Sequence, residues 1–266
     1  MSKAAAWSDL NTRLASALVM VLVGGAAIWA GGAWFLALAA LVTGGMVWEL
    51  SRMTAPDAKP GQSFVIALGA ALALPVAVCL SHPLWLLALA GPALALALTE
   101  RRDRVLATLY ALGTVVAVWG LVGLRAGAGG FLAVLWLVAT IAVTDIMGYF
   151  AGRYFGGPKF WPSISPKKTW SGTVAGWIGA AVVGGVFWLG GIAGAELIPV
   201  SVLVAFAGQM GDILESWIKR REGVKDSSAL IPGHGGLLDR FDALSAAALL
   251  IVVLAALDVL PVQVWG

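Results

Sequence analysis

The sequence predicts an all-α, polytopic integral membrane protein with about nine transmembrane helices and a cytoplasmic N-terminus. Only 12% of the 266 residues are charged and 60% are hydrophobic, whereas a soluble domain carries about 25% charged residues. A single soluble core of this size cannot bury so much apolar surface. The apolar residues form continuous runs and do not alternate with polar ones, which favours membrane-spanning helices over the strands of a barrel.

Nine apolar segments are candidates for these helices. Most approach the roughly 20 residues that a helix needs to cross the hydrocarbon core. The segment at 197–210 is the weakest, and a half-membrane or tilted helix would also explain it. The nine segments are 14–30, 33–50, 64–80, 83–98, 105–124, 131–151, 172–193, 197–210 and 243–260.

The basic residues predict the orientation of the chain in the membrane. Sixteen of the 17 Lys and Arg residues lie in alternate loops, and only Arg125 lies on the other side. By the positive-inside rule, the N-terminus and all five basic loops are cytoplasmic, and nine spans put the C-terminus around Trp265 outside. The five groups are Lys3 and Arg13; Arg52 and Lys59; Arg101, Arg102 and Arg104; Arg153, Lys159, Lys167 and Lys168; and Lys219, Arg220, Arg221, Lys225 and Arg240.

Polar residues divide the chain into two regions of different character. Residues 1–130 form a region of transmembrane helices with little that could do chemistry, and we expect them to act as a scaffold. Glu49 and Arg52, three residues apart, are interpreted there as an ion pair at a helix end. Residues 131–266 form the predicted catalytic region, with two polar loops on the cytoplasmic side.

The first polar loop follows Asp145. An ionisable group at or inside the membrane is costly, so Asp145 is a functional candidate, although a helix-end pair with Arg153 would also explain it. Lys167 and Lys168 are flanked by hydroxyls at Ser165 and Thr169. Two ammonium groups beside hydroxyls suit a phosphate group, but a basic loop at the bilayer face can also attract anionic lipid.

The segment "GDILESWIKRR" would have a charged face if it is helical. Asp212, Glu215 and Lys219 fall at positions i, i+3 and i+7, along one side of that helix. Two carboxylates on one face make a plausible site for a divalent cation such as magnesium. A solvated amphipathic helix is the alternative interpretation.

The second polar loop, "KDSSALIPGHGGLLDRFD" at 225–242, holds the densest set of polar residues. Its glycines let the backbone approach a ligand closely. Carboxylates that hold magnesium, with Lys and Arg facing phosphate oxygens, are typical of phosphoryl or nucleotidyl transfer. One histidine without a nearby cysteine does not support a zinc site, and a P-loop sequence is missing. The polar residues of this loop are Lys225, Asp226, His234, Asp239, Arg240 and Asp242.

The segment "SWIKRREGVKDSSALIPGHGGLLDRFD", Ser216 to Asp242, closely resembles the signature of the phosphatidate cytidylyltransferases, also called CDP-diacylglycerol synthases. The upstream segments "TDIMGYFAGRYFGGPKF" and "SPKKTWSG" also resemble motifs of that family. Together these segments cover nearly the last half of the chain, and the first half matches only as a set of spans. One residue departs from the family pattern: Ser171 stands where members commonly have Glu.

The resemblance implies an enzyme of the bacterial inner membrane that converts CTP and phosphatidate into CDP-diacylglycerol and pyrophosphate, with its active site on the cytoplasmic side. It implies magnesium as the cofactor, admits a monovalent cation such as potassium, and implies a homodimer in the lipid bilayer. No nucleic-acid partner is expected.

The same resemblance assigns roles to the polar residues. The catalytic residues would be Asp212, Asp239, Asp242, Lys168 and His234. Magnesium would be held by Asp212, Asp239 and Asp242, with Asp145 and Glu215 as further candidate ligands. The substrates would contact Ser165, Lys167, Lys168, Thr169, Lys219, Arg220, Lys225, Asp226, Gly235, Gly236 and Arg240.

Three other functions compete with this one. A CTP-dependent lipid kinase, of the polyprenol type, would share the carboxylates and magnesium but transfer the terminal phosphate. A transporter would also have many spans, but its charges would be expected in mid-span and not in two cytoplasmic loops. A relative of the family that has lost its activity is the third alternative.

Overall fold

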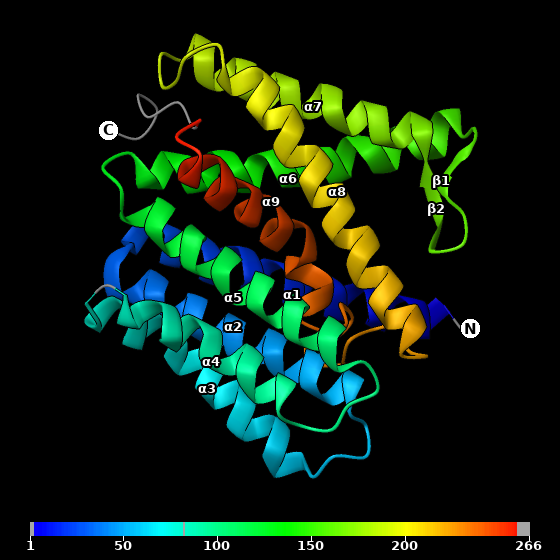
Figure 1. The fold of residues 1–266 in the computed structure, drawn as a ribbon. Coiled ribbons are helices and arrows are strands. Elements are labelled where there is room, and N and C mark those ends of the chain that lie inside the picture. Colours follow the sequence, from blue (N-terminus) through cyan, green and yellow to red (C-terminus); the bar gives the residue numbers. More distant parts are fainter. Residues whose placement is uncertain (1–2, 82, 260–266) are drawn as a thin grey trace. The chain divides into compact units, whose positions relative to one another are not determined.

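The computed structural model describes residues 3–81 and 83–259, with side chains from Leu10 onward, and these residues form nine helices and one small hairpin (Figure 1). The predicted position of the C-terminus around Trp265 lies outside the described residues. The helices are α1 (Lys3–Ala30), α2 (Gly32–Thr54), α3 (Pro60–Cys79), α4 (Leu84–Ala97), α5 (Arg104–Ala126), α6 (Gly130–Phe155), α7 (Trp170–Leu189), α8 (Leu197–Arg221) and α9 (Leu238–Ala256).

Each predicted apolar segment corresponds to one helix, which confirms the all-α membrane fold. Seven helices of the described chain are long and apolar enough to cross a bilayer; α4 is shorter, and α9 begins with charged residues. The segment at 197–210, predicted to be the weakest, belongs to the 25-residue helix α8 and is one of the seven. Its charged end after residue 210 continues the same helix.

The helices fall into two compact units. The first unit contains Met1–Val116 and Arg221–Phe241, and the second contains Ala117–Arg220 and Asp242–Gly266. The loop at 221–241 belongs to the first unit because it packs against α1 and α2. The functional division into scaffold and catalytic region stays a prediction.

In the first unit, α2 packs on α3, and α3 packs on α4. Small residues allow the close approach of α2 and α3. A Cβ atom added to Gly44 would lie 2.9 Å from the Ala71 Cβ and 3.0 Å from the Ala67 carbonyl oxygen. In this way the glycine-rich segment of α2 serves packing, and one face of α2 becomes buried together with its single carboxylate, Glu49.

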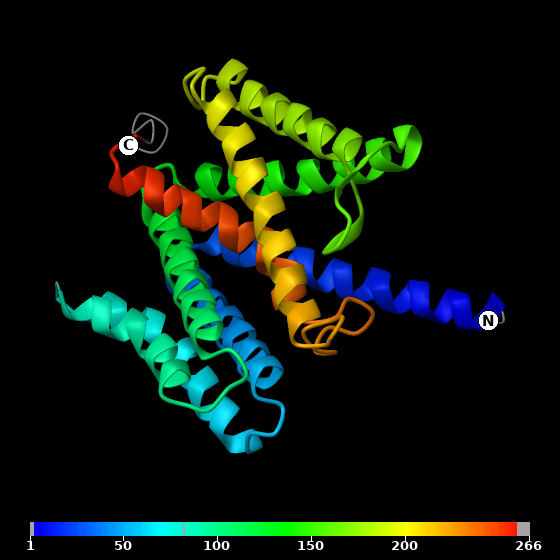
Figure 2. The same cartoon turned by 45° about the vertical axis from the view of Figure 1, so that its right-hand side comes forward.

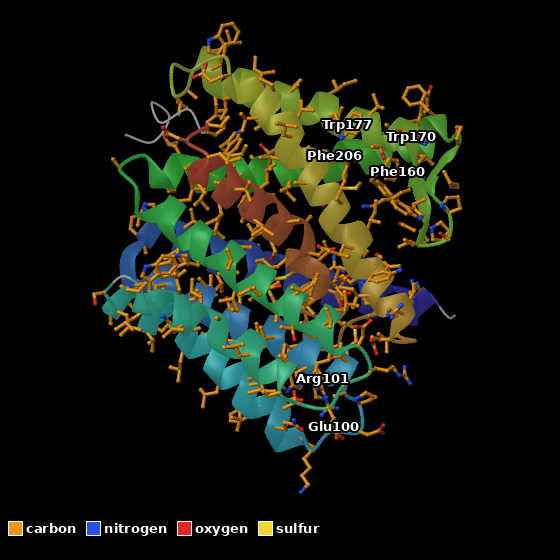
Figure 3. All side chains as sticks on the ribbon, in the orientation of Figure 1. Glu100, Arg101, Phe160, Trp170, Trp177 and Phe206 are labelled. Atoms are coloured by element: carbon orange, nitrogen blue, oxygen red, sulfur yellow. The ribbon has the colours of Figure 1, made fainter. Side chains whose placement is uncertain are left out.

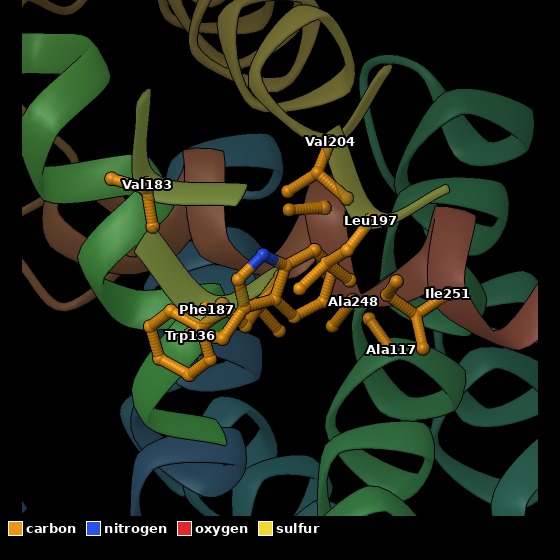
Figure 4. Packing of buried hydrophobic residues seen from close by; sticks show 10 residues of the cluster. Ala117, Trp136, Val183, Phe187, Leu197, Val204, Ala248 and Ile251 are labelled. Atoms are coloured by element: carbon orange, nitrogen blue, oxygen red, sulfur yellow. The ribbon is translucent and has the colours of Figure 1, made fainter. Parts of the chain in front are cut away.

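In the second unit, α6 and α7 lie side by side, as Figure 1 and Figure 2 show from two directions. The core of this unit surrounds Trp136, whose side chain is fully buried and whose indole N–H donates a hydrogen bond to Ser201 Oγ at 2.8 Å. Figure 4 shows the apolar side chains packed around it. They are Ala117, Leu137, Val183, Phe187, Leu197, Val204, Ala247, Ala248 and Ile251.

The first polar loop contains a β-hairpin. Strand β1 (Lys159–Trp161) pairs antiparallel with β2 (Ser165–Thr169). The Thr169 side chain then accepts a hydrogen bond from the Gly172 N–H at 3.2 Å, which caps the N-terminus of α7. Figure 3 shows Phe160 of the hairpin beside Trp170, with ring centroids 4.7 Å apart. The hairpin is therefore fixed to the start of α7.

Candidate active site

A cavity of about 380 Å³ lies in the second unit, between α6, β2, α7 and α8. It contains four charged residues that the sequence predicts to be functional or to pair with such a residue: Asp145, Arg153, Lys167 and Lys168. The remaining lining residues are small or carry hydroxyl or amide groups. They are Thr144, Gly148, Tyr149, Gly152, Thr169, Gly172, Thr173 and Gln209.

Glycines on two helices create the floor of this cavity. A Cβ atom on Gly172 would lie 2.6 Å from the Gly148 carbonyl oxygen, and one on Gly152 would lie 2.9 Å from Thr169 Oγ1. The backbones of α6 and α7 are therefore in direct contact where α6 passes the start of α7. Positions 145, 148, 149, 152 and 153 share one face of a helix, so this contact turns Asp145 and Arg153 toward the hairpin.

Gln209 links the two helices that form another wall. Its side-chain oxygen accepts a hydrogen bond from the Trp177 indole N–H at 2.9 Å, and its amide nitrogen donates to the Thr173 carbonyl at 3.4 Å. Figure 3 shows Trp177 of α7 near Phe206 of α8, and their ring centroids are 6.2 Å apart. These contacts hold α8 against α7 and position the charged end of α8 next to the cavity.

Two predicted site residues pair at the cavity wall. Lys168 Nζ lies 2.5 Å from Asp212 Oδ2 and 3.4 Å from the Gln209 carbonyl oxygen. Arg153 instead donates a hydrogen bond to the Tyr149 hydroxyl at 2.8 Å. The cavity wall thus carries cationic groups on two elements, as expected for a site that holds phosphate oxygens.

Ser171, which departs from the family pattern, is hydrogen-bonded locally. Its hydroxyl donates to the Gly156 carbonyl and lies 3.1 Å from Thr169 Oγ1. The residue joins the end of α6 to the start of α7, and it adds no charge to the site.

Glu215 and Lys219 form a second ion pair of 2.5 Å along α8. The Glu215 side chain is only 1% exposed and that of Lys219 10%. A buried carboxylate needs a compensating charge, and Lys219 supplies it. The two residues predicted to bind a metal and a substrate therefore neutralise each other in this structure.

Asp242 lies at the point where α9 passes α8. A Cβ atom on Gly211 would be 2.7 Å from the Asp242 carbonyl oxygen and 2.5 Å from Ala246 Cβ, so the two helices touch there. Burial raises the pKa of the Asp242 carboxyl to about 7, and the charge of Asp212 acts in the same direction. Asp242 precedes the apolar part of α9 and shares this region with Asp212, Lys168 and Lys219.

The loop at 225–242 belongs to the first unit up to Phe241. Gly233 and Gly235 have φ values of 74° and 85°, which favour glycine. The turn between them is closed by hydrogen bonds from the His234 N–H to the Ile231 carbonyl and from the Ile231 N–H to the Gly235 carbonyl, at 2.9 and 2.8 Å. Arg240 donates to the His234 carbonyl at 2.9 Å. The loop is thus an ordered structure whose shape depends on its glycines.

Asp239 stabilises this loop from the first turn of α9. One oxygen, Oδ2, accepts hydrogen bonds from the Ser227 N–H and hydroxyl at 3.0 and 2.8 Å, and from the Gly236 N–H at 2.8 Å. Lys225, Asp226 and Arg240 are exposed. Asp239 therefore performs a structural task in addition to any role in metal binding.

Glu49 is the residue that sequence reasoning misjudged. It does not form the predicted helix-end pair: its side chain is fully buried and accepts hydrogen bonds from the loop at 227–238. The Arg52 guanidinium lies instead over the Trp48 ring, 5.7 Å from its centroid. An ionisable residue inside an apolar segment was the signal, since the same argument singled out Asp145.

The carboxylates of the described chain do not form a ready-made metal cluster: no group of three His, Cys, Asp or Glu residues among them converges on one point. Asp212 and Asp242 are neighbours in the second unit. Magnesium is usually bound by one or two carboxylates together with substrate phosphates. The pair Asp212 and Asp242 fits that donor set. In this structure Asp212 is paired with Lys168 and Glu215 with Lys219, and the role of Glu215 as a ligand stays a prediction.

The fold and the site define a class of protein: a polytopic membrane protein with lysines, an arginine and a carboxylate around one cavity, as in enzymes of phosphorylated substrates. The chain belongs to the cytidylyltransferase family, whose model matches residues 11–258. This match confirms the resemblance inferred from the sequence and makes the chain a nucleotidyltransferase.

Individual relatives agree with this family assignment. The chain is 36% identical over 262 residues to the phosphatidate cytidylyltransferase of Brucella abortus biovar 1, and the match covers 94% of each chain. It is 38% identical over 127 residues to the enzyme of that name from Helicobacter pylori, which is 47% of each chain. It is 41% identical over 125 residues to that of Haemophilus influenzae, covering 44% of this chain and 43% of the relative.

Proposed function

We propose that this protein transfers the cytidylyl group of CTP to phosphatidate, giving CDP-diacylglycerol and pyrophosphate for phospholipid synthesis. The observation that carries the proposal is the cavity formed by α6, β2, α7 and α8, whose walls bear Arg153, Lys167 and Lys168. The relative from Brucella abortus, matched along 94% of both chains, supports the choice of substrates.

The reaction follows from the charges of its reactants. A phosphate oxygen of phosphatidate attacks the α-phosphorus of CTP and forms a new P–O bond, and the bond to the β-phosphate breaks, so pyrophosphate leaves. The attacking oxygen is already anionic, so no strong general base is needed. The protein must hold two anions together and offset their charge.

The cavity residues suit that task. We propose that Lys167 and Lys168 contact phosphate oxygens, that Ser165 and Thr169 support them on β2, and that Arg153 adds a planar donor group from α6. His234, Gly235 and Gly236 would shape the second loop, and the exposed side chains of that loop would contact the substrates. These side chains are Lys225, Asp226 and Arg240. Arg220 at the end of α8 would also contact the substrates, and Lys219 would join it after exchange of its partner Glu215.

Magnesium is part of this proposal. Asp212 and Asp242 would hold it, with Asp145 as a further candidate ligand. The role of Asp239 as a ligand stays a prediction of the resemblance. When bound, magnesium neutralises phosphate charge that accumulates as pyrophosphate leaves. A monovalent cation such as potassium stays a prediction of the resemblance.

We further propose that the active site faces the cytoplasm in the bacterial inner membrane. The support is the distribution of basic residues, of which 16 of 17 occupy alternate loops. CTP is a cytoplasmic substrate, so this orientation gives it access to the site. A homodimer is proposed on the resemblance alone.

The position of a radioactive label tests the function. Purified protein in detergent is supplied with phosphatidate, magnesium and CTP labelled at the α-phosphorus, and label is counted in the chloroform-soluble lipid. We expect magnesium-dependent incorporation, which Lys168→Ala and Asp239→Asn greatly reduce. Lys59→Ala, an exposed lysine of the loop before α3, serves as the matched control and should be fully active.

CTP labelled at the γ-phosphorus separates the main alternative. A CTP-dependent lipid kinase would transfer the γ-label to lipid and leave the α-label in water. A folded wild type that incorporates only γ-label would contradict the proposed function.

A further inference from the structure

Glu49 has an unusual environment for a carboxylate in a membrane helix. Its side chain is completely buried near the end of α2, and a buried charge is costly unless hydrogen bonds compensate it. Oε1 accepts from the Ser228 hydroxyl at 2.6 Å and the Leu237 N–H at 2.9 Å. Oε2 accepts from the Ser227 hydroxyl at 3.2 Å and the Leu238 N–H at 2.7 Å.

These donors come from both ends of one loop. Ser227 and Ser228 open the segment that contains His234, and Leu237 and Leu238 close it. A single carboxylate on α2 therefore joins the beginning of the loop to its end, and Asp239 makes a second such connection from α9. Fixing the two ends of a loop limits the positions available to the residues between them.

The closing donors lie at the start of α9: Leu238 is its first residue, and Leu237 directly precedes it. The first N–H groups of a helix lack partners within the helix, and they favour a negative charge nearby. A side chain next to the start of a helix usually caps these groups. Here Glu49 supplies the negative charge from another helix. The carboxylate thus fixes both the loop and the start of the helix that carries Asp239.

The glycine at 236 shows how closely the parts fit. A Cβ atom there would lie 2.0 Å from Ser227 Oγ and 2.4 Å from Glu49 Oε1. Any other residue would push the loop away from the carboxylate. Gly236 therefore leaves room for the contact between the loop and Glu49. The sequence alone suggests a different role, the close approach of the backbone to a ligand.

We infer that Glu49 is a positioning residue for the reaction: it holds the loop at 227–238 and the first turn of α9 in the conformation that transfer requires. The inference rests on the proposed function for its activity assay. Glu49 contacts neither substrate in this account and acts through His234 and Asp239, whose backbone and side chain belong to the structure that it closes.

The test combines kinetics with amide hydrogen exchange. Glu49→Gln keeps the size of the side chain but replaces one acceptor oxygen by a donor, which then faces the donors of the loop. We expect kcat to fall about 100-fold, since a shift of about 1 Å at a catalytic group has that effect, while the KM values for CTP and phosphatidate change little. The amides of Leu237 and Leu238 should exchange faster, and those of α3 and α7 should not.

Two further variants complete the design. Ser228→Ala removes one donor and leaves the carboxylate, so it should lower kcat less and loosen the same amides. In the Glu49→Gln background, Ser228→Ala should have a smaller effect than in the wild type, because both changes disturb the contact between the Ser228 hydroxyl and the side chain at position 49. The hydrogen bond from the Leu230 N–H to Ser228 Oγ is lost in either background. Glu100→Gln, an exposed glutamate of the first unit, is the control and should behave as the wild type.

Wild-type kcat or wild-type exchange at Leu237 and Leu238 in folded Glu49→Gln would overturn the inference. Faster exchange throughout the chain would also overturn it, because Glu49 would then be a general stability residue. If Glu49→Gln does not fold, the same readouts on Ser228→Ala decide the matter. Should the wild type itself form no CDP-diacylglycerol, the proposed function fails, while the exchange experiment still tests the contact of Glu49 with the loop.

Discussion

Lys168 on β2 and Asp212 on α8 are joined by an ion pair, with Nζ and Oδ2 2.5 Å apart. Their numbers differ by 44, and the sequence assigns one to phosphate binding and the other to magnesium. The pair links the hairpin to the carboxylate-bearing helix beside the cavity. Under the proposed function, substrate phosphate and magnesium would each replace one partner, so the ion pair keeps both groups near their sites of action.

Removing the charge of Lys168 should therefore lower the activity of the protein much more than it lowers its folding stability. Lys168→Ala is expected to lower kcat/KM about 100-fold or more, because a charged donor to the transferred phosphoryl group is lost. Lys168→Arg should recover part of the activity. Steady-state assays with both substrates check this, and Lys59→Ala provides the baseline. A fully active Lys168→Ala protein would remove Lys168 from the site.

Magnesium dependence should identify the carboxylates that hold the metal. Chelation by EDTA is expected to abolish activity, and added magnesium should restore it. Asp242→Asn and Asp212→Asn should each require much more magnesium for half-maximal rate, since each removes a ligand. Titration of activity against magnesium measures this shift. Unchanged magnesium curves in both variants would contradict their assignment as ligands.

Contact between α6 and α7 should depend on a glycine at position 172. Gly172→Ala introduces a Cβ atom that would lie 2.6 Å from the Gly148 carbonyl oxygen, and overpacking of this kind costs about 1–3 kcal/mol. The melting temperature in detergent should fall. Gly185→Ala on the same helix meets no atom within 4 Å, so it should melt at or above the wild-type temperature. Equal melting of the two variants would argue against the close contact.

Glu222 should make stability depend on pH. Burial raises the pKa of the Glu222 carboxyl, and Arg102, whose nitrogen lies 4.0 Å away, opposes this only partly. The folded protein then keeps this proton at a pH where the unfolded chain has released it, so folding stability falls as the pH rises from the ordinary pKa through the folded one. Glu222→Gln has no carboxyl group to titrate, so its stability should not fall in this way. At pH values above the pKa of folded Glu222, the variant should melt at a higher temperature than the wild type.

The measurement is the difference in melting temperature between Glu222→Gln and the wild type, from about pH 4 to about pH 8. The difference should grow with pH and then become constant. Asp57→Asn, at an exposed position between α2 and α3, controls for the loss of one negative charge. A difference that shrinks as the pH rises would reverse the predicted sign.

Sequence reasoning predicted the helices well because continuous apolar runs of sufficient length have few alternatives in a membrane. It predicted the α8 segment less well, since the apolar part ends at residue 210 while the helix continues to Arg221. Helix formation does not require apolar residues once the chain leaves the hydrocarbon core, so hydropathy alone gives the wrong end.

The site was predictable in composition but not in contacts. Asp145, Lys167 and Lys168 were selected as candidates and do line one cavity. Glu49 was taken for a local pair because its neighbour Arg52 lies three residues away, whereas its true partners are 178 to 189 residues further along the chain. Local spacing carries no information about such contacts, and only the packing of the loop against α2 reveals them.

The most direct test of the central claim is the stoichiometry of the products. Purified wild-type protein, phosphatidate, CTP and magnesium are incubated, and mass spectrometry of the lipid is combined with an assay for pyrophosphate. If the protein transfers the cytidylyl group, we expect CDP-diacylglycerol and pyrophosphate in equal amounts, and the formation of both should depend on phosphatidate. Formation of CDP together with a newly phosphorylated lipid, or no product from a folded protein, would contradict it.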